Sequence, residues 1–125
     1  LHEDASRAEL GNPNHLDVYL LESSLEYLLG HGIDSIAAHA CQLAGRLHET
    51  LSALNLEVIT PSNPSERATN IAFAHSNDTK VVRQAVEAGI FLWDGGGRVR
   101  ASVHLFNSET DIDSYVDWLK STQLG

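Results

Sequence analysis

The sequence predicts an α+β fold: a small, mostly antiparallel sheet with helices packed on one face. Two long stretches with helical apolar spacing fill the first half of the chain, and short β-type stretches occupy the second half. The β-type stretches come in close pairs, with helices between and around them, rather than in strict βαβ alternation. The chain has 125 residues, of which 42% are hydrophobic, so we expect a single domain over residues 1–125.

The first half predicts two helices. A polar stretch over residues 1–14 ends in the turn sequence Gly11-Asn12-Pro13-Asn14. A helix is expected from Leu16 to Leu29, because apolar residues recur there at spacings of three and four, and Gly30-His31-Gly32 ends it. A second helix is expected from about Ile33 to Leu54, with an apolar stripe of Ile33, Ile36, Ala40, Leu43, Leu47, Leu51 and Leu54.

The second half predicts four strands and two helices. Asp94-Gly95-Gly96-Gly97 joins two strands, so we interpret it as a hairpin turn and not as a phosphate-binding loop, which would lead into a helix. In chain order the expected elements are strands over 56–59 and 70–74, a helix that Ser76-Asn77-Asp78 caps and Gly89 ends, strands over 90–94 and 98–106, and a last helix that Ser108-Glu109-Thr110-Asp111 caps.

Composition argues against several classes of protein. The formal net charge of −9 and the pI near 5.0 disfavour binding to nucleic-acid phosphates. No apolar run is long enough to predict a membrane span. The single cysteine, Cys41, can form no internal disulfide, so a cytoplasmic protein is expected. Its apolar neighbours predict that Cys41 packs on a helix face, and Trp93 is expected in the core.

No metal centre is predicted. The seven histidines include His31, His39 and His48, but spacings of eight and nine do not place them on one helix face at i, i+4. The Gly-x-Ser-x-Gly motif of serine hydrolases is missing. The two lysines, Lys80 and Lys120, lie outside any apolar stretch that would suit a Schiff base.

The fourth expected strand carries the clearest candidate for a binding site. Two arginines on one face lie about 7 Å apart, close enough to hold one or two anions, and a guanidinium binds a carboxylate or phosphate through paired hydrogen bonds. The alternative is an edge strand with solvated charges and an Asp94–Arg98 ion pair. The polar face comprises Arg98, Arg100, Ser102 and His104, and the apolar face Val99, Ala101, Val103 and Leu105.

Four landmarks in order are the Gly11–Asn14 turn, two long helices, the strand from Arg98 to Asn107, and the acidic segment Glu109-Thr110-Asp111-Ile112-Asp113. From about Arg7 to Lys120, this order resembles the carboxy-terminal small domain of class V aminotransferases. These fold-type-I enzymes use pyridoxal phosphate, and the group includes cysteine desulfurases. The resemblance implies an amino acid substrate, a homodimer, and residues 1–15 that enter from a large pyridoxal-phosphate-binding domain.

The resemblance also implies roles for individual residues. Arg100 falls where the family places the arginine that binds the substrate's α-carboxylate. Gly11 and Asn12 fall where a Gly-Thr-Pro segment reaches the cofactor phosphate of the neighbouring subunit; Asn12 replaces the threonine, and its amide can still donate a hydrogen bond. The family's Schiff-base lysine lies upstream in the large domain, so this chain alone is not expected to catalyse transamination. The interval 92–98 lacks the cysteine of persulfide-forming desulfurases.

Two alternatives remain open at this point. One is a free-standing α+β module that binds a small molecule or a protein, with an arginine-lined anion site. The other is a structural subunit that pairs with a separate cofactor-domain chain. A domain of a larger enzyme should expose an apolar region around residues 16–29, whereas a free-standing module should not. The chain begins without methionine, which favours a piece of a longer chain.

Overall fold

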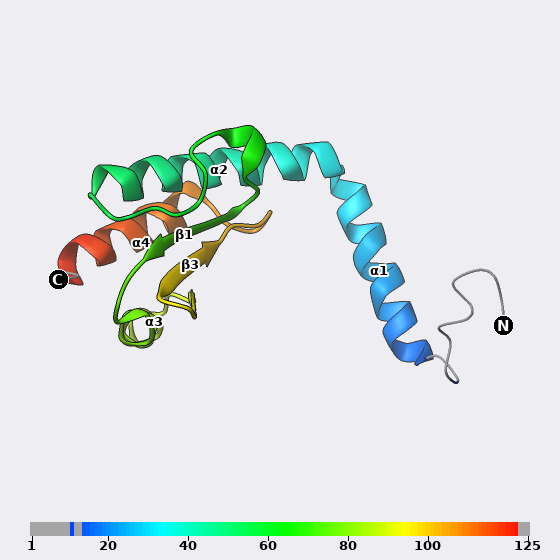
Figure 1. Cartoon of the computed structure of the whole chain (residues 1–125). Coiled ribbons are helices and arrows are strands. Elements are labelled where there is room, and N and C mark those ends of the chain that lie inside the picture. The colour runs from blue at the N-terminus through cyan, green and yellow to red at the C-terminus, as the bar shows by residue number, and fades with distance from the viewer. Residues whose placement is uncertain (1–10, 12–13, 123–125) are drawn as a thin grey trace, which may run out of the picture. The chain divides into compact units, whose positions relative to one another are not determined.

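The computed structural model describes residue 11 and residues 14–122 (Figure 1). The chain divides into two compact units, residues 1–35 and 36–125, which are described separately below. In chain order the elements are α1 (His15–His31), α2 (Ile33–Ala53), the 3-10 turn η2 (Pro64–Glu66), β1 (Asn70–Ala74), α3 (Asp78–Glu87), β2 (Trp93–Asp94), β3 (Arg98–Ser102) and α4 (Glu109–Thr122). Among the described residues, none of these helices is both long enough and apolar enough to cross a bilayer.

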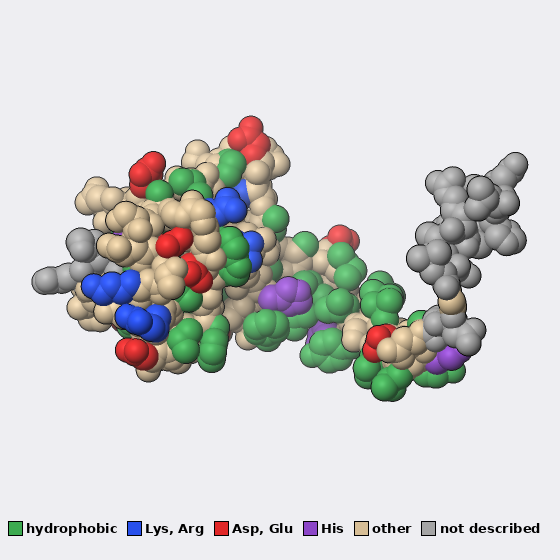
Figure 2. Space-filling view, turned by 60° about the horizontal axis from the view of Figure 1, so that its bottom comes forward, with side chains coloured by type: hydrophobic (Ala, Val, Ile, Leu, Met, Phe, Trp, Pro, Cys, Tyr) green, Lys and Arg blue, Asp and Glu red, His purple; other side chains and the backbone are tan. Residues whose placement is uncertain are grey.

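Helix α1 forms where the apolar spacing predicts it. Asn14 caps its first turn, because the side-chain oxygen accepts a hydrogen bond from the N–H of Asp17. Gly32, at a φ of 82°, ends it, as the glycine cluster predicts. No side chain of α1 is buried, and hydrophobic side chains gather along it (Figure 2). The large exposed ones are Leu16, Val18, Tyr19, Leu20, Leu21, Leu25, Tyr27 and Leu29.

Helix α2 carries the predicted apolar stripe into the core of the second unit from Ala40 onward, whereas Ile33 at its start is exposed. Its buried residues are Ala40, Leu43, Ala44, Leu47, His48 and Leu51. The prediction that Cys41 packs on a helix face is wrong, because the thiol is exposed. Cys41 directly follows the buried Ala40, and one residue turns a helix by about 100°, which carries its side chain away from the stripe.

The sheet of the second unit is antiparallel throughout, with the strand order β1-β3-β2, so the predicted α+β class is confirmed. Strand β3 therefore lies in the middle of the sheet. Arg100 pairs with Ala72 of β1 on one side and with Trp93 of β2 on the other. Val99 pairs with Phe73 and with Asp94 in the same register.

Three of the four predicted strands are shorter than expected. Residues 56–59 contribute only an isolated bridge, between Val58 and Phe73. The predicted strand 90–94 is reduced to β2, because the N–H of Ile90 is bonded to the carbonyl of Ala85 at the end of α3 and the segment leaves the sheet. The predicted strand 98–106 ends at Ser102, since the chain turns where the Asn107 side chain accepts from the N–H of His104.

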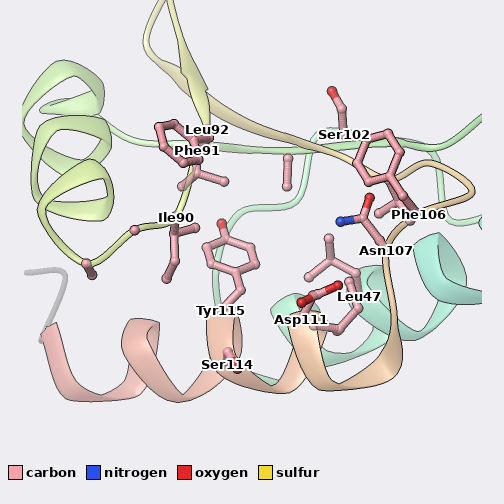
Figure 3. Close-up of a pocket in the computed structure, with 15 residues that line it drawn as sticks. Leu47, Ile90, Phe91, Leu92, Ser102, Phe106, Asn107, Asp111, Ser114 and Tyr115 are labelled. Carbon is pink, nitrogen blue, oxygen red and sulfur yellow. The ribbon is translucent and has the colours of Figure 1, made fainter.

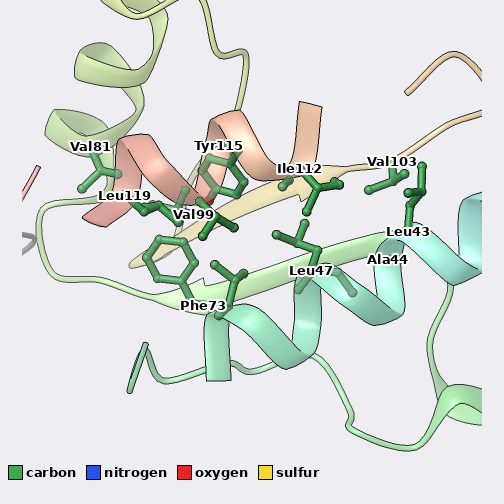
Figure 4. Close-up of a cluster of buried hydrophobic side chains, with 14 residues drawn as sticks. Leu43, Ala44, Leu47, Phe73, Val81, Val99, Val103, Ile112, Tyr115 and Leu119 are labelled. Atoms are coloured by element: carbon green, nitrogen blue, oxygen red, sulfur yellow. The ribbon is translucent and has the colours of Figure 1, made fainter. Parts of the chain in front are cut away.

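The core lies between the sheet and helices α2, α3 and α4 (Figure 4). Phe73 and Val99, directly paired on β1 and β3, are both fully buried at its centre. An ion-pair cluster joins two of the helices over this core: Arg46 of α2 lies 2.7 Å from Glu109 and 2.5 Å from Asp113 of α4. The sheet thus has one face against helices and the opposite face free to present polar side chains.

Local capping agrees with the sequence at α4 and only partly at α3. At α4, Ser108 and Asp111 form the predicted reciprocal pair: the Asp111 carboxylate accepts from the Ser108 N–H, and the Ser108 hydroxyl accepts from the Asp111 N–H. At α3, Asn77 holds the cap position but its side chain makes no capping hydrogen bond. Asp78 instead accepts from the N–H of Gly97, which ties the start of α3 to the β2–β3 turn.

Candidate functional site: an arginine on the open face of the sheet

Apolar and polar side chains alternate between the two faces of β3, as predicted. Val99 and Ala101 are buried against the helices, Arg98 and Ser102 are exposed, and Arg100 is half-buried on the polar face. The edge-strand alternative is wrong, because β3 is the central strand. The Asp94–Arg98 ion pair expected with it does not form among the described residues; Asp94 accepts a hydrogen bond from Thr79 at 2.6 Å instead.

The indole of Trp93 stacks against the arginines. The guanidinium carbon of Arg100 lies 4.6 Å from the centroid of the ring, and that of Arg98 lies 5.6 Å from it. The prediction that Trp93 packs in the core is wrong, since 42% of the residue is exposed. The physical reason is its register: Trp93 is the direct antiparallel partner of Arg100, and directly paired residues place their side chains on the same face.

Gly95 lies against the same indole. A Cβ atom at Gly95 would lie 2.5 Å from the Trp93 ring. The ring would have to move to admit any side chain at this position. The φ of Gly95 is also positive, at 154°. The hairpin turn predicted from the three glycines is confirmed, and the first of them leaves room for the ring of Trp93.

Arg100 has unused hydrogen-bonding capacity. Its Nε is buried and has no hydrogen-bond partner within the described part of the chain. Neither Arg98 nor Arg100 takes part in any ion pair among those residues. A guanidinium presents five N–H donors in a rigid plane, which matches the two oxygens of a carboxylate. The arrangement is therefore suited to bind an anion on the open face of the sheet.

A pocket of about 530 Å³ opens on the helix-packed side of the same sheet (Figure 3). Residues 88–92, the end of β3 and the start of α4 line it. The buried hydroxyl of Tyr115 points into it and has no hydrogen-bond partner in the described residues. Burial raises the pKa of that hydroxyl. Sequence reasoning missed this pocket, because a strand over 90–94 would have paired with β3 where the pocket lies.

The structure gives little support for cofactor contacts at the residues that the sequence suggests for them. Gly11 is exposed, with no atom within 4 Å of the position its Cβ would take, and Asn12 lies outside the described residues. Lys80 is exposed on α3, and the exposed Lys120 lies 3.4 Å from Asp117. Neither lysine lies in the apolar, desolvated setting that suits Schiff-base formation, so covalent attachment of pyridoxal phosphate does not fit this chain.

Two histidines have structural roles. The imidazole of His39 is hydrogen-bonded to the carbonyl of Asn107 at 2.8 Å, and that of His48 to the carbonyl of Thr60 at 3.0 Å. Both contacts tie α2 to loops of the second unit. In the part of the chain that the structure describes, no three His, Cys, Asp or Glu side chains lie close enough together to hold a metal ion.

Comparison with known proteins gives a family and a fold. A family model described as "Aminotransferase class-V" matches residues 1–115. A cysteine desulfurase from Thermococcus onnurineus NA1 is 23% identical with a TM-score of 0.87, and the match covers 97% of this chain and 34% of that one. The cysteine desulfurase CsdA from Escherichia coli is 22% identical with a TM-score of 0.77, over 89% of this chain and 31% of that one. The chain thus spans about a third of the length of these structures.

Proposed function

Because the chain belongs to the class V aminotransferase family, we propose that it is the substrate-orienting small domain of a pyridoxal-phosphate-dependent enzyme that acts on an amino acid. The observation that carries this proposal is Arg100, a half-buried guanidinium on the central strand with a buried Nε that has no partner in the described residues. In the complete enzyme, this chain is joined to a large cofactor domain, and Arg100 binds the α-carboxylate of the substrate.

The position of Arg100 suits this role. It lies on β3 between two hydrogen-bonded neighbours, so the backbone that carries it is held on both sides. Its neighbours Val99 and Ala101 are buried in the core, which fixes the strand against the helices. A substrate anchor needs such a rigid base, because a small misplacement at the reacting atoms costs rate.

The cofactor chemistry is supplied from outside this chain. Pyridoxal phosphate withdraws electrons from the carbon that carries the substrate's amine. The lysines of this chain do not fit its attachment. What this chain contributes is binding and orientation, and on its own it is not competent for catalysis.

The exposed apolar surface of helix α1 is an argument for a partner domain. The helix buries none of its own side chains, and eight large hydrophobic residues on its 17 positions are exposed. Apolar surface of this extent is typical of a region that packs against another protein segment. A free-standing module should lack such a surface, so the observation favours a large cofactor domain as the partner. A homodimer, with Gly11 and Asn12 near the neighbouring subunit's cofactor, and a cytoplasmic location stay predictions.

The reaction does not depend on a persulfide cysteine from this chain. Only the three-glycine turn separates β2 from β3, and it carries no thiol. Cys41, the single cysteine of the chain, lies on α2, on a different element from the arginines. We therefore place the chemistry among the reactions of this family that need no such cysteine.

The test is kinetic and uses the complete enzyme with the best substrate from a panel of amino acids. Arg100→Lys keeps the charge but loses the paired hydrogen bonds, which are worth about 1.5–3 kcal/mol, so KM should rise roughly 10- to 150-fold. Arg98→Lys, on the same strand face but exposed, is the matched control and should change KM less than about threefold. Equal effects of the two substitutions would contradict the assignment of Arg100 as the residue that binds the carboxylate.

A further inference from the structure

We propose that Trp93 is a positioning residue for Arg100: its indole holds the guanidinium by the flat face and leaves the hydrogen-bonding edge free for a carboxylate. This inference rests on the proposed function, because it assumes that Arg100 binds the substrate. Gly95 belongs to the same arrangement, since only a glycine leaves room for the ring at this point of the turn.

The Trp93 ring contacts both the β2–β3 turn and Arg100. The backbone of Gly95 lies beside the outer end of the ring, which fills the space that a Cβ would need. The guanidinium carbon of Arg100 lies 4.6 Å from the centroid of the same ring, well inside the range of about 6 Å for a cation–π contact. Trp93 and Arg100 are direct partners in the β2–β3 pairing, so the sheet itself sets their distance.

The way in which Arg100 is held differs from that of Arg46. Arg46 is fixed by carboxylates, at 2.7 Å from Glu109 and 2.5 Å from Asp113, and these contacts occupy one N–H donor on each of its two terminal nitrogens. A ring face holds a guanidinium through its quadrupole and occupies none of the donors. Arg100 is therefore ordered before a ligand arrives, and no ion pair in the described residues occupies its terminal N–H groups.

Ordering before binding raises affinity, because the ligand then has less side-chain freedom to remove. A long arginine side chain loses more rotamer freedom than most others when it is fixed. Arg98 gains less from the ring: its guanidinium carbon is 5.6 Å from the centroid and the residue is exposed. Trp93 thus favours Arg100 over Arg98 as the anchor.

The first measurement uses the full chain and needs no activity. In the NMR spectrum, the Nε–H proton of Arg100 should resonate upfield of those of the other arginine side chains, because the guanidinium lies over the indole. Trp93→Leu should remove this displacement, Trp93→Tyr should keep part of it, and Gly95→Ala should alter it by pushing the ring. Phe106→Leu, at an exposed aromatic residue whose ring stacks on His104, should leave it unchanged. An Arg100 signal that Trp93→Leu does not move would overturn the inference.

The second measurement uses the complete enzyme. Trp93→Leu should raise the KM for the amino acid about 2- to 30-fold, in line with the strength of such a contact, with a smaller change in kcat. Trp93→Tyr should recover most of the loss, which a merely structural role of the indole would not produce, and Phe106→Leu should have no effect. If Arg100→Lys raises KM and Trp93→Leu does not, the positioning role is wrong and the proposed function stands. If Trp93→Leu moves the Arg100 signal but Arg100→Lys leaves KM unchanged, the proposed function is wrong, and the positioning role with it.

Discussion

Val99 links the core to the arginine site, and its replacement by alanine has a calculable cost. Val99 is 0% exposed, and it immediately precedes Arg100 on the central strand. Val99→Ala removes two buried methyl groups at roughly 0.8 kcal/mol each, or about 1.6 kcal/mol of transfer free energy. The cavity that remains adds to this, so the free energy of unfolding should fall by about 2–3 kcal/mol in total.

The matched control is Val86→Ala on α3, where the same two methyl groups are removed from a side chain that is 47% exposed. That change should stay within about 0.5 kcal/mol. Urea unfolding of the full chain, followed by circular dichroism, separates the two. With an m-value near 2 kcal/mol/M, Val99→Ala should lower the midpoint by roughly 1–1.5 M at an unchanged slope. If both variants shift the midpoint equally, the assignment of Val99 to the centre of the core is wrong.

Three further predictions concern single side chains. Ser108→Ala removes the reciprocal cap with Asp111 and should cost about 1 kcal/mol of unfolding free energy in the same urea assay, while Ser108→Asn should retain most of it. The N–H of Thr79, helped by that of Gly97, holds the pKa of Asp78 below its ordinary 3.8, so its stabilisation is present above about pH 4 and is lost as the pH falls through the lowered value. The stability difference between the wild type and Asp78→Asn, followed from pH 6 to pH 2, should therefore shrink below about pH 4; a difference independent of pH would refute this. Cys41 is exposed, so one equivalent of thiol reagent should react with the native chain without denaturant, and a reaction that waits for unfolding would contradict its placement.

The sequence alone predicts the features that follow from local periodicity. The apolar stripe of α2 and the alternation of β3 depend only on spacing, and they correctly separate Val99 from Arg100. The cap of α4 depends on Ser108 and Asp111, three residues apart, and is also correct. These predictions place Arg98 and Arg100 together on the polar face of β3, and the choice of Arg100 between them comes from the family resemblance.

The features that the sequence does not predict depend on tertiary contacts. Residues 90–92 have strand character, but the bond from Ile90 to Ala85 takes them out of the sheet. Because residues 90–92 leave the sheet, the pocket is open and the Tyr115 hydroxyl faces it. Trp93 has the bulk of a core residue, and only its register opposite Arg100 places it on the open face. Neither outcome can be derived from spacing, because each is decided by a partner that is distant in the chain or on another strand.

The central claim is that Arg100 binds the α-carboxylate of an amino acid. The most direct test compares two ligands that differ only in that group: the amino acid substrate and the amine that remains when its carboxylate is removed. Competitive inhibition constants for both are measured on the complete enzyme, with the native residue and with Arg100→Lys. We expect Arg100→Lys to raise the inhibition constant of the amino acid by roughly 10- to 150-fold. The inhibition constant of the amine should change by less than about twofold. An equal loss for both ligands would contradict the claim, because Arg100 would then support the site without contacting the carboxylate.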